Sequence, residues 1–332
     1  MKILKNIKRP EHGFESWQQI SEQDIVINLG TEVNIGVVVA MKSEILQVIN
    51  QLNHYKEYKV DGFDFYTGSL TCNIDSVHQR VIPLVIGISG PGKVNAALCT
   101  EIMIELFEAD CILNVGIVGA ISKYLNVYDM VVAREVVQAD IDTTAVGDEM
   151  GLVSRLNITY FGTDTKLTDK AFSICEKLPK TENVAQKREA ELQADKEYFE
   201  DIYKKMGPPI PIGMVNDTIC KSYTTVNLNY KKPNSVIGGL VATTDSFIGS
   251  EEQKKKITDN FPSTLVCDME LGAIAQTCYI KEVPLVSVKL ISDNADNTAV
   301  ESYPEVLKTA SSVFLIFFEE YLYGVYEKLV NG

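Results

Sequence analysis

The sequence predicts an α/β protein: a single-domain, three-layer α/β/α sandwich with a mixed, mostly parallel central sheet. Short runs of β-branched residues, such as IGVVVA at 35–40, alternate with longer segments whose apolar residues recur at helical spacing. Several of these runs are apolar throughout, which is typical of strands covered on both faces. Strands that alternate with helices favour a sheet with a helical layer on each side.

The predicted elements begin at residue 35 and continue to the C-terminus. Apolar β-branched runs predict strands at 35–40, 80–89, 111–116, 130–137, 235–245, 264–269 and 284–292. Helical spacing of apolar residues predicts helices at 41–52, 92–109, 166–178, 270–282 and 303–330.

Two segments fall outside this pattern. Residues 1–34 are polar and irregular, with one candidate strand at 24–29, so we expect an N-terminal extension to a domain that spans 35–330. Residues 181–235 combine a charged helical segment with the Pro-rich turn GPPIPIG. Because this segment holds too few apolar residues for a core of its own, we expect an insertion into the domain.

Composition excludes several classes of partner. The net charge of −14 argues against nucleic acid and anionic membrane surfaces, which require clustered Lys and Arg. The apolar run at 313–318 is too short to cross a bilayer. The N-terminus lacks the apolar segment of a secretory signal, so a cytoplasmic location is expected.

Cysteine and histidine spacing gives no sign of a metal site. The seven cysteines are widely spaced without a Cys-x-x-Cys pair, which predicts buried free thiols in a reducing compartment. The three histidines have no ligand spacing either. We therefore expect no metal and no cofactor.

The segment GISGPGKV, Gly87 to Val94, fits the first seven positions of a phosphate-binding P-loop. The eighth position requires Ser or Thr to bind magnesium, and Val94 stands there, so an NTPase is excluded. Two interpretations remain open. The segment is either a tight Gly-rich turn between a strand and a helix, or a helix N-terminus whose amides face a small ligand.

Three acidic side chains follow predicted buried strands. They are Glu44 in AMKSE, Glu270 in CDMELGAIA and Asp293 in KLISDNAD. Each alone is explained by helix capping or the helix dipole. Because ligands of open α/β sheets bind beyond the carboxyl ends of parallel strands, three such acids are expected to converge on one pocket. Paired carboxyl groups suit the cleavage of a glycosidic bond by acid and base, without a metal.

The motifs AMKSE, SGPGKVNAA, ILNVGIVGA, YDMVVAREVVQADIDTTAVG, ATTDSFI, CDMELGAIA and VKLISDNAD occur in this order along the chain. The set resembles the 5′-methylthioadenosine/S-adenosylhomocysteine nucleosidases of the nucleoside phosphorylase superfamily. The resemblance covers residues 35–178 and 236 to the C-terminus. It implies a nucleoside phosphorylase-like fold and a purine nucleoside as substrate.

The resemblance also implies roles for individual residues. Glu44 matches the general base that activates water, and Asp293 matches the general acid that protonates purine N7, with Ser292 holding it. Glu270 matches the residue that binds the ribose hydroxyls. The other matched positions are Met269 against the sugar, Phe247 stacked on the purine, Ile248 at its Watson–Crick edge, and Met41, Pro91 and Tyr303 around the 5′ substituent.

The family's members are homodimers in which a loop of the partner subunit closes the 5′ pocket. The matching loop here is 142–147, where Thr143 and Val146 replace an aliphatic and an aromatic residue. A smaller, more polar wall weakens the binding of an alkylthio group. Two further departures, Ile117 for a serine and Lys289 for an arginine, remove donors that hold the nucleophile or phosphate. The resemblance nevertheless places Lys289 among the substrate-binding residues.

Water is the preferred nucleophile, because the carboxylate of Glu44 would repel phosphate. The sequence therefore predicts an N-glycosyl hydrolase that acts on 5′-substituted adenosines. Three alternatives remain open: a purine nucleoside phosphorylase, an adenosine nucleosidase, and a non-catalytic nucleoside-binding relative of the same fold. Retention of all three acids favours the enzyme over the binding protein.

Overall fold

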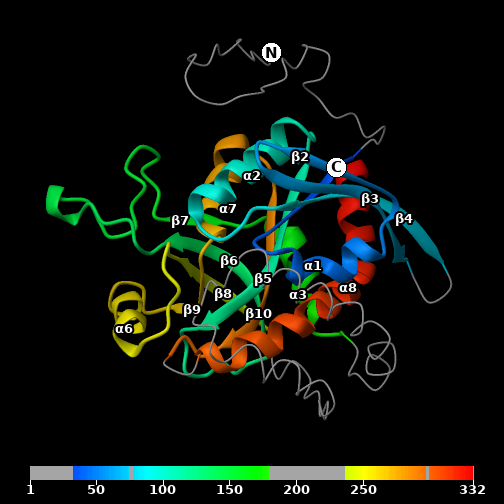
Figure 1. Ribbon diagram of the computed structural model, residues 1–332. Coiled ribbons are helices and arrows are strands. Elements are labelled where there is room, and N and C mark those ends of the chain that lie inside the picture. The colour runs from blue at the N-terminus through cyan, green and yellow to red at the C-terminus, as the bar shows by residue number, and fades with distance from the viewer. Residues whose placement is uncertain (1–32, 75–77, 179–235, 297–298, 332) are drawn as a thin grey trace.

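The computed structural model describes residues 33–74, 78–178, 236–296 and 299–331 (Figure 1). The predicted N-terminal extension, except for its last two residues, lies outside this range. The predicted insertion at 181–235 also lies outside it.

Strands and helices alternate along most of the described chain (Figure 1). The strands are β1 (Ile35–Val39), β2 (Asn53–Val60), β3 (Phe63–Asn73), β4 (Gln79–Ile88), β5 (Cys111–Ala120), β6 (Met130–Gln138), β7 (Tyr160–Gly162), β8 (Val236–Thr243), β9 (Thr264–Asp268) and β10 (Leu285–Asp293). The helices are α1 (Lys42–Asn50), α2 (Lys93–Glu105), α3 (Thr165–Cys175), α6 (Glu251–Asn260), α7 (Leu271–Lys281) and α8 (Ala299–Asn331).

Every predicted strand and helix in the described residues is present, with small shifts at the ends. Strands β2, β3 and β7 and helix α6 were not predicted. The sequence of β2, NHYKEYKV, is mostly polar because the strand is exposed along most of its length. In α6 only Ile257 is buried, so the helix lacks an apolar stripe. Elements that bury little apolar surface give a weak periodic signal.

The sheet runs in the order β10-β6-β8-β9-β5-β1-β4-β3-β2, with β7 on β6. It is mixed, as predicted. Parallel pairing joins β1 to β4 and β5, β5 to β10, and β8 to β6 and β9. Since β10 pairs with both β5 and β6, the strands β5, β9, β8, β6 and β10 form a closed circuit. Strands β1 to β4 extend from this circuit as an open sheet.

Helices cover both faces of the sheet, which gives the three layers (Figure 1). Helices α1, α3 and α8 pack on one face, where the aromatic side chains Phe314, Phe318 and Tyr321 are fully buried. Helices α2 and α7 contact each other over the other face. The two apolar layers hold the central strands in place, so the ends of these strands form a firm base for a site.

The described residues lack any helix that combines the length and apolar character needed to cross a membrane. Their six cysteines are buried free thiols, and burial raises the pKa of each. A neutral buried thiol behaves as a small apolar side chain, so these cysteines serve packing.

Candidate active site

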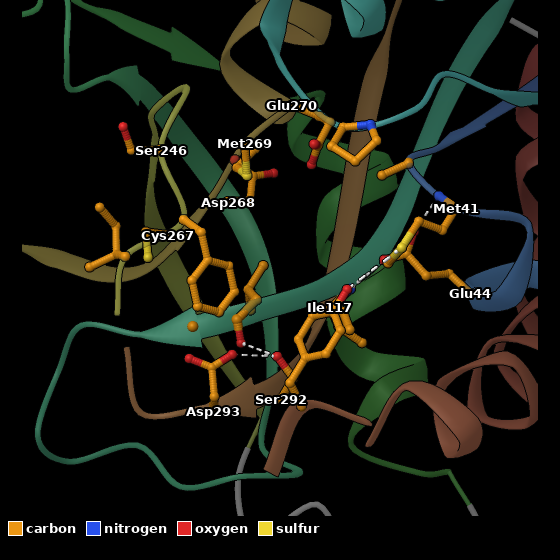
Figure 2. A pocket seen from close by; sticks show the side chains of 17 residues that line it. Met41, Glu44, Ile117, Ser246, Cys267, Asp268, Met269, Glu270, Ser292 and Asp293 are labelled. Atoms are coloured by element: carbon orange, nitrogen blue, oxygen red, sulfur yellow. Dashed lines mark hydrogen bonds between the residues drawn. The ribbon is translucent and has the colours of Figure 1, made fainter. Parts of the chain in front are cut away.

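A pocket opens where β1, β5, β9 and β10 end, and Glu44, Glu270 and Asp293 reach it from three sides (Figure 2). The structure thus brings the three predicted acids together. Seven other residues predicted for the site also line this pocket: Met41, Pro91, Phe247, Ile248, Met269, Ser292 and Tyr303.

Two of the acids arrive at the pocket on parallel strands. Strands β1 and β10 both run parallel to β5, so their carboxyl ends lie at the same edge. Glu44 is in the first turn of the helix that follows β1, and Asp293 is the last residue of β10. The expectation of three parallel strands is wrong for Glu270, because the preceding strand β9 runs antiparallel to β5. The closed circuit of strands brings the end of β9 to the same pocket.

Glu44 is 2% exposed, and backbone amides hold both of its oxygens. The Ile117 N–H donates to Oε1 at 3.0 Å, and the Met41 N–H donates to Oε2 at 2.8 Å. Burial raises the pKa of Glu44, while these two hydrogen bonds and the nearby ammonium of Lys289 oppose the rise. The carboxyl group is therefore fixed in direction and made more basic than a solvated glutamate.

Asp293 is 1% exposed and is also held at both oxygens. The Ala295 N–H donates to Oδ1 at 2.8 Å, and the Ser292 hydroxyl donates to Oδ2 at 2.7 Å. Burial raises the pKa of Asp293, and the two hydrogen bonds oppose this. The register of β10 against β5 shifts between Ile291 and Asp293. Such a bulge lets the consecutive residues Ser292 and Asp293 both line the pocket.

Two glycines of β5 leave room for these two carboxyl groups. A Cβ atom on Gly116 would lie 2.9 Å from Glu44 Oε1, and a Cβ atom on Gly119 would lie 2.9 Å from Asp293 Oδ1. Real Cβ atoms do not approach other heavy atoms so closely, so any larger residue would displace the acid. Glycine inside a strand often marks such a close approach.

A buried ion pair joins Asp268, which lines the pocket, to a lysine behind it. Lys289 and Asp268, whose side chains are 2% and 1% exposed, meet with Nζ 2.7 Å from Oδ2. The Thr243 hydroxyl at 2.6 Å and the Leu271 N–H at 3.1 Å also donate to Asp268. Lys289 does not line the pocket, although the sequence placed it in the binding set. Its ammonium group neutralises Asp268 and acts on Glu44 through space.

Glu270 sits at the N-terminus of α7 and is 9% exposed. The Gly92 N–H donates to its Oε1 at 2.9 Å. Burial, followed by the negative charge of Asp268, raises the pKa of Glu270 to about 8. The Gly-rich turn before α2 therefore presents an amide to a carboxyl group of the protein itself.

Thr143 and Val146 do not line this pocket. They belong to a short 3₁₀ turn and its N-cap beyond β6, and Val146 is 81% exposed. Asp268, Cys267, Ser246, Val118 and Gly119 line the pocket but were not assigned to it from the sequence. Two glycines within the apolar strand NVGIVGA were the available signal for Gly119. No local signal distinguishes Cys267 from a core cysteine.

The geometry provides a carboxyl group at each end of one pocket. Glu44 and Asp293 are both deeply buried, and both are oriented by two donors, which is the arrangement that acid and base catalysis requires. Among the described residues, no group of three or more His, Cys, Asp or Glu side chains could hold a metal ion.

Comparison with known proteins agrees with this geometry. Residues 34–322 match the model of the phosphorylase superfamily. A 5′-methylthioadenosine/S-adenosylhomocysteine nucleosidase of Staphylococcus aureus strain MRSA252 is 31% identical over 277 residues, which are 83% of this chain and 93% of the relative.

Solved structures of nucleosidases from other bacteria share the fold. The 5′-methylthioadenosine/S-adenosylhomocysteine nucleosidase of Neisseria meningitidis, in complex with methylthio-immucillin-A, has a TM-score of 0.65 and 27% identity, covering 87% of this chain and 98% of its own. The enzyme of the same name from Colwellia psychrerythraea 34H, in complex with adenine, has a TM-score of 0.64 and 25% identity, covering 88% and 96%. The family and the fold predicted from the motifs are confirmed: this chain belongs to the 5′-methylthioadenosine/S-adenosylhomocysteine nucleosidase family of the phosphorylase superfamily.

Proposed function

We propose that the protein hydrolyses the N-glycosidic bond of 5′-methylthioadenosine and S-adenosylhomocysteine, releasing adenine and the 5′-substituted ribose. The observation that carries this proposal is the convergence of the buried acids Glu44, Glu270 and Asp293 on one pocket. The inhibitor and adenine bound to the Neisseria and Colwellia relatives support the substrate class.

Asp293 is the proposed general acid. Burial favours its protonated form, and the donors on both of its oxygens stabilise the carboxylate that remains after the proton has left. Adenine is a poor leaving group as an anion, so a proton delivered to N7 allows it to leave as a neutral base. The bulge that exposes Asp293 to the pocket supports this role.

Glu44 is the proposed general base. Its carboxylate removes a proton from a water molecule that attacks C1′ of the ribose as the bond to adenine breaks. The Ile117 main chain holds this acid, so the exchange of serine for isoleucine leaves the orientation of the base intact. This observation favours an enzyme over a binding protein with lost chemistry.

The charges around Glu44 support water as the nucleophile. Asp268 is already paired with Lys289, the cation beside Glu44, so the carboxylate of Glu44 is left without an ion-pair partner of its own in this set. A phosphate dianion here would face negative charge in a buried setting without a free cation from this set. Phosphorolysis is therefore disfavoured.

The remaining pocket residues have proposed binding roles. Glu270 accepts hydrogen bonds from the ribose hydroxyls, and Met269 packs on the sugar. Phe247 stacks on the purine, while the Ile248 main chain contacts its edge. The 5′ substituent lies against Met41, Pro91 and Tyr303; the Tyr303 hydroxyl is 3.6 Å from Met41 Sδ, so this side of the pocket is apolar with one polar tip.

A homodimer is proposed as the active form. Helix α2 exposes Val94 at 70% and Leu98 at 51%, and the 3₁₀ turn beyond β6 exposes Val146 at 81%. Exposed apolar residues of this kind fit a protein interface. In the dimer, Thr143 and Val146 would close the partner's 5′ pocket. The buried free thiols support a reducing compartment and hence a cytoplasmic location.

The test is adenine release from methylthioadenosine, S-adenosylhomocysteine and adenosine, each with and without phosphate, with Asp293→Asn as the control. Release that ignores phosphate and is lost in the variant is the expected result. Release that requires phosphate would make the protein a phosphorylase. Binding of adenine without release from any substrate would contradict the catalytic role.

A further inference from the structure

The loop between β8 and α6, residues 244–250, carries three residues that line the pocket: Ser246, Phe247 and Ile248. Phe247 is 38% exposed, and its ring meets that of Tyr303 edge-on with centroids 6.1 Å apart. An aromatic ring on an exposed loop can stack on a ligand only if the loop is fixed in place. The contacts at both ends of this loop therefore matter for binding.

The far end of the loop is fixed by the helix that follows it. Gln253 in the first turn of α6 accepts from the Gly249 N–H at 3.1 Å, and its side-chain amide lies 3.4 Å from the Phe247 carbonyl oxygen. Ser250 caps the same helix. These contacts are local, because they join residues that are near one another in the sequence.

The near end of the loop is fixed by a ring of three hydrogen bonds between distant segments. The Asp245 N–H donates to Asp140 Oδ2 at 2.8 Å, and the Lys93 ammonium donates to Asp140 Oδ1 at 2.6 Å. The Lys93 N–H, at the N-terminus of α2, closes the ring by donating to Asp245 Oδ1 at 2.8 Å. Asp140 thus uses one oxygen for each of its two partners.

We infer that Asp140 is a positioning residue for Phe247, and that Lys93 is its partner in this role. The inference rests on the proposed function, since it assigns purine stacking to Phe247. Asp140 lies just beyond β6, Lys93 opens α2 and Asp245 follows β8, so the ring ties the loop to two rigid elements. Asp140 itself does not line the pocket.

The chemistry of the ring explains why a carboxylate is needed. The two donors meet different oxygens of Asp140, so an asparagine in the same position would present its oxygen to one donor and its NH₂ group to the other. That NH₂ group would point its hydrogens at a donor. The side chain of Lys93 is only 15% exposed, so its charge is partly shielded from water and gains from a fixed partner.

The test compares Asp140→Asn and Lys93→Met with Asp259→Asn, which removes the negative charge of an exposed ion pair with Lys255 at 2.6 Å. Four quantities are measured: kcat and KM for methylthioadenosine, the dissociation constant of adenine by calorimetry, and the dissociation constant of 5-methylthioribose. Adenine probes the purine half of the pocket, and 5-methylthioribose probes the sugar half. Thermal unfolding checks that each variant is folded.

A positioning role predicts a change confined to the purine half. Adenine binding and KM should weaken about five- to tenfold in Asp140→Asn and Lys93→Met, with kcat within about twofold of the native value. Binding of 5-methylthioribose and the Asp259→Asn control should stay unchanged. The double variant should lose no more than either single variant, because both break the same ring.

Two results would overturn the inference. One is unchanged adenine affinity in both variants, which would make the ring an ordinary surface ion pair. The other is an equal loss for adenine and 5-methylthioribose, which would indicate general distortion. If the native protein binds adenine but releases none from any nucleoside, the proposed function fails, and the adenine measurements still decide the role of Asp140.

Discussion

The floor and the rim of the pocket are built in different ways. On the floor, Glu44 and Asp293 are 2% and 1% exposed, and each is held by two short hydrogen bonds beside a glycine of β5. On the rim, Phe247 is 38% exposed on a loop, and the rim is proposed to be completed by the partner subunit's copy of the turn that carries Val146, which is 81% exposed. The difference indicates that the sheet positions the catalytic groups, whereas the loops determine affinity and substrate choice.

The largest expected effect comes from removing the base on the floor. Glu44→Gln keeps the shape of the side chain but cannot accept a proton, so kcat should fall by about 10²- to 10⁴-fold with KM little changed. Adenine release under saturating substrate measures this. A variant that keeps more than a tenth of the native kcat would show that Glu44 is not the base.

The next largest effect is expected when the space between Gly119 and the carboxyl group of Asp293 is filled. In Gly119→Ala the new methyl group would lie 2.9 Å from Asp293 Oδ1, so the acid must move and kcat should fall about 100-fold. Gly162→Ala is the matched control, because a Cβ atom on that strand glycine meets nothing within 4 Å. Equal activity in the two variants would contradict a role for the space at Gly119.

Behind the floor, the buried ion pair should affect stability more than any surface pair. Lys289→Met leaves Asp268 buried without its cation, which should cost about 3–5 kcal/mol of unfolding free energy. Lys255→Met, which breaks an exposed pair, should cost less than about 1 kcal/mol. Urea unfolding measures both. If Lys289→Met with Asp268→Asn is no more stable than Lys289→Met alone, the cost does not come from the unpaired charge.

The raised pKa of Glu270, about 8, makes the stability of the unliganded protein depend on pH. The folded state keeps a proton on Glu270 that the unfolded chain releases near its ordinary pKa of 4.5, so this group destabilises the fold as pH rises toward 8. Glu270→Gln removes the ionisation. The melting temperature of Glu270→Gln relative to the native protein should therefore increase between pH 5 and pH 8.5, and a constant difference would contradict the raised pKa.

The smallest effect belongs to the rim. Val146→Phe would enlarge the apolar wall that the partner subunit is proposed to supply, so KM for methylthioadenosine should fall about five- to tenfold with kcat unchanged. KM for adenosine, which lacks the thioether, should change less. If the substitution changes KM by the same factor for both substrates, Val146 does not reach the 5′ pocket.

The sequence predicted the core of this molecule better than its edges. Apolar strands such as β1 and β10 and the acids that follow them were recognisable because burial leaves a pattern along the chain. The polar strand β2 and helix α6 were missed because they bury few side chains.

Contacts between residues far apart in the sequence could not be predicted from local sequence patterns. The pairing of Lys289 with Asp268 joins residues 21 apart, and the ring through Asp140 joins residues 47 and 105 apart. Neither follows from spacing or propensity. The motif resemblance supplied most of the pocket residues, yet it assigned Lys289 to the binding set, whereas the structure places its ammonium group behind the pocket on Asp268.

The main-chain hydrogen bond from Ile117 to Glu44 has an evolutionary consequence. Every residue except proline carries an N–H group, so the bond survives almost any mutation at this position. The side chain at 117 also lines the pocket, which leaves it open to selection for a different ligand. Descendants of one ancestral enzyme could thus change the wall of the cavity step by step while the catalytic base stayed in place.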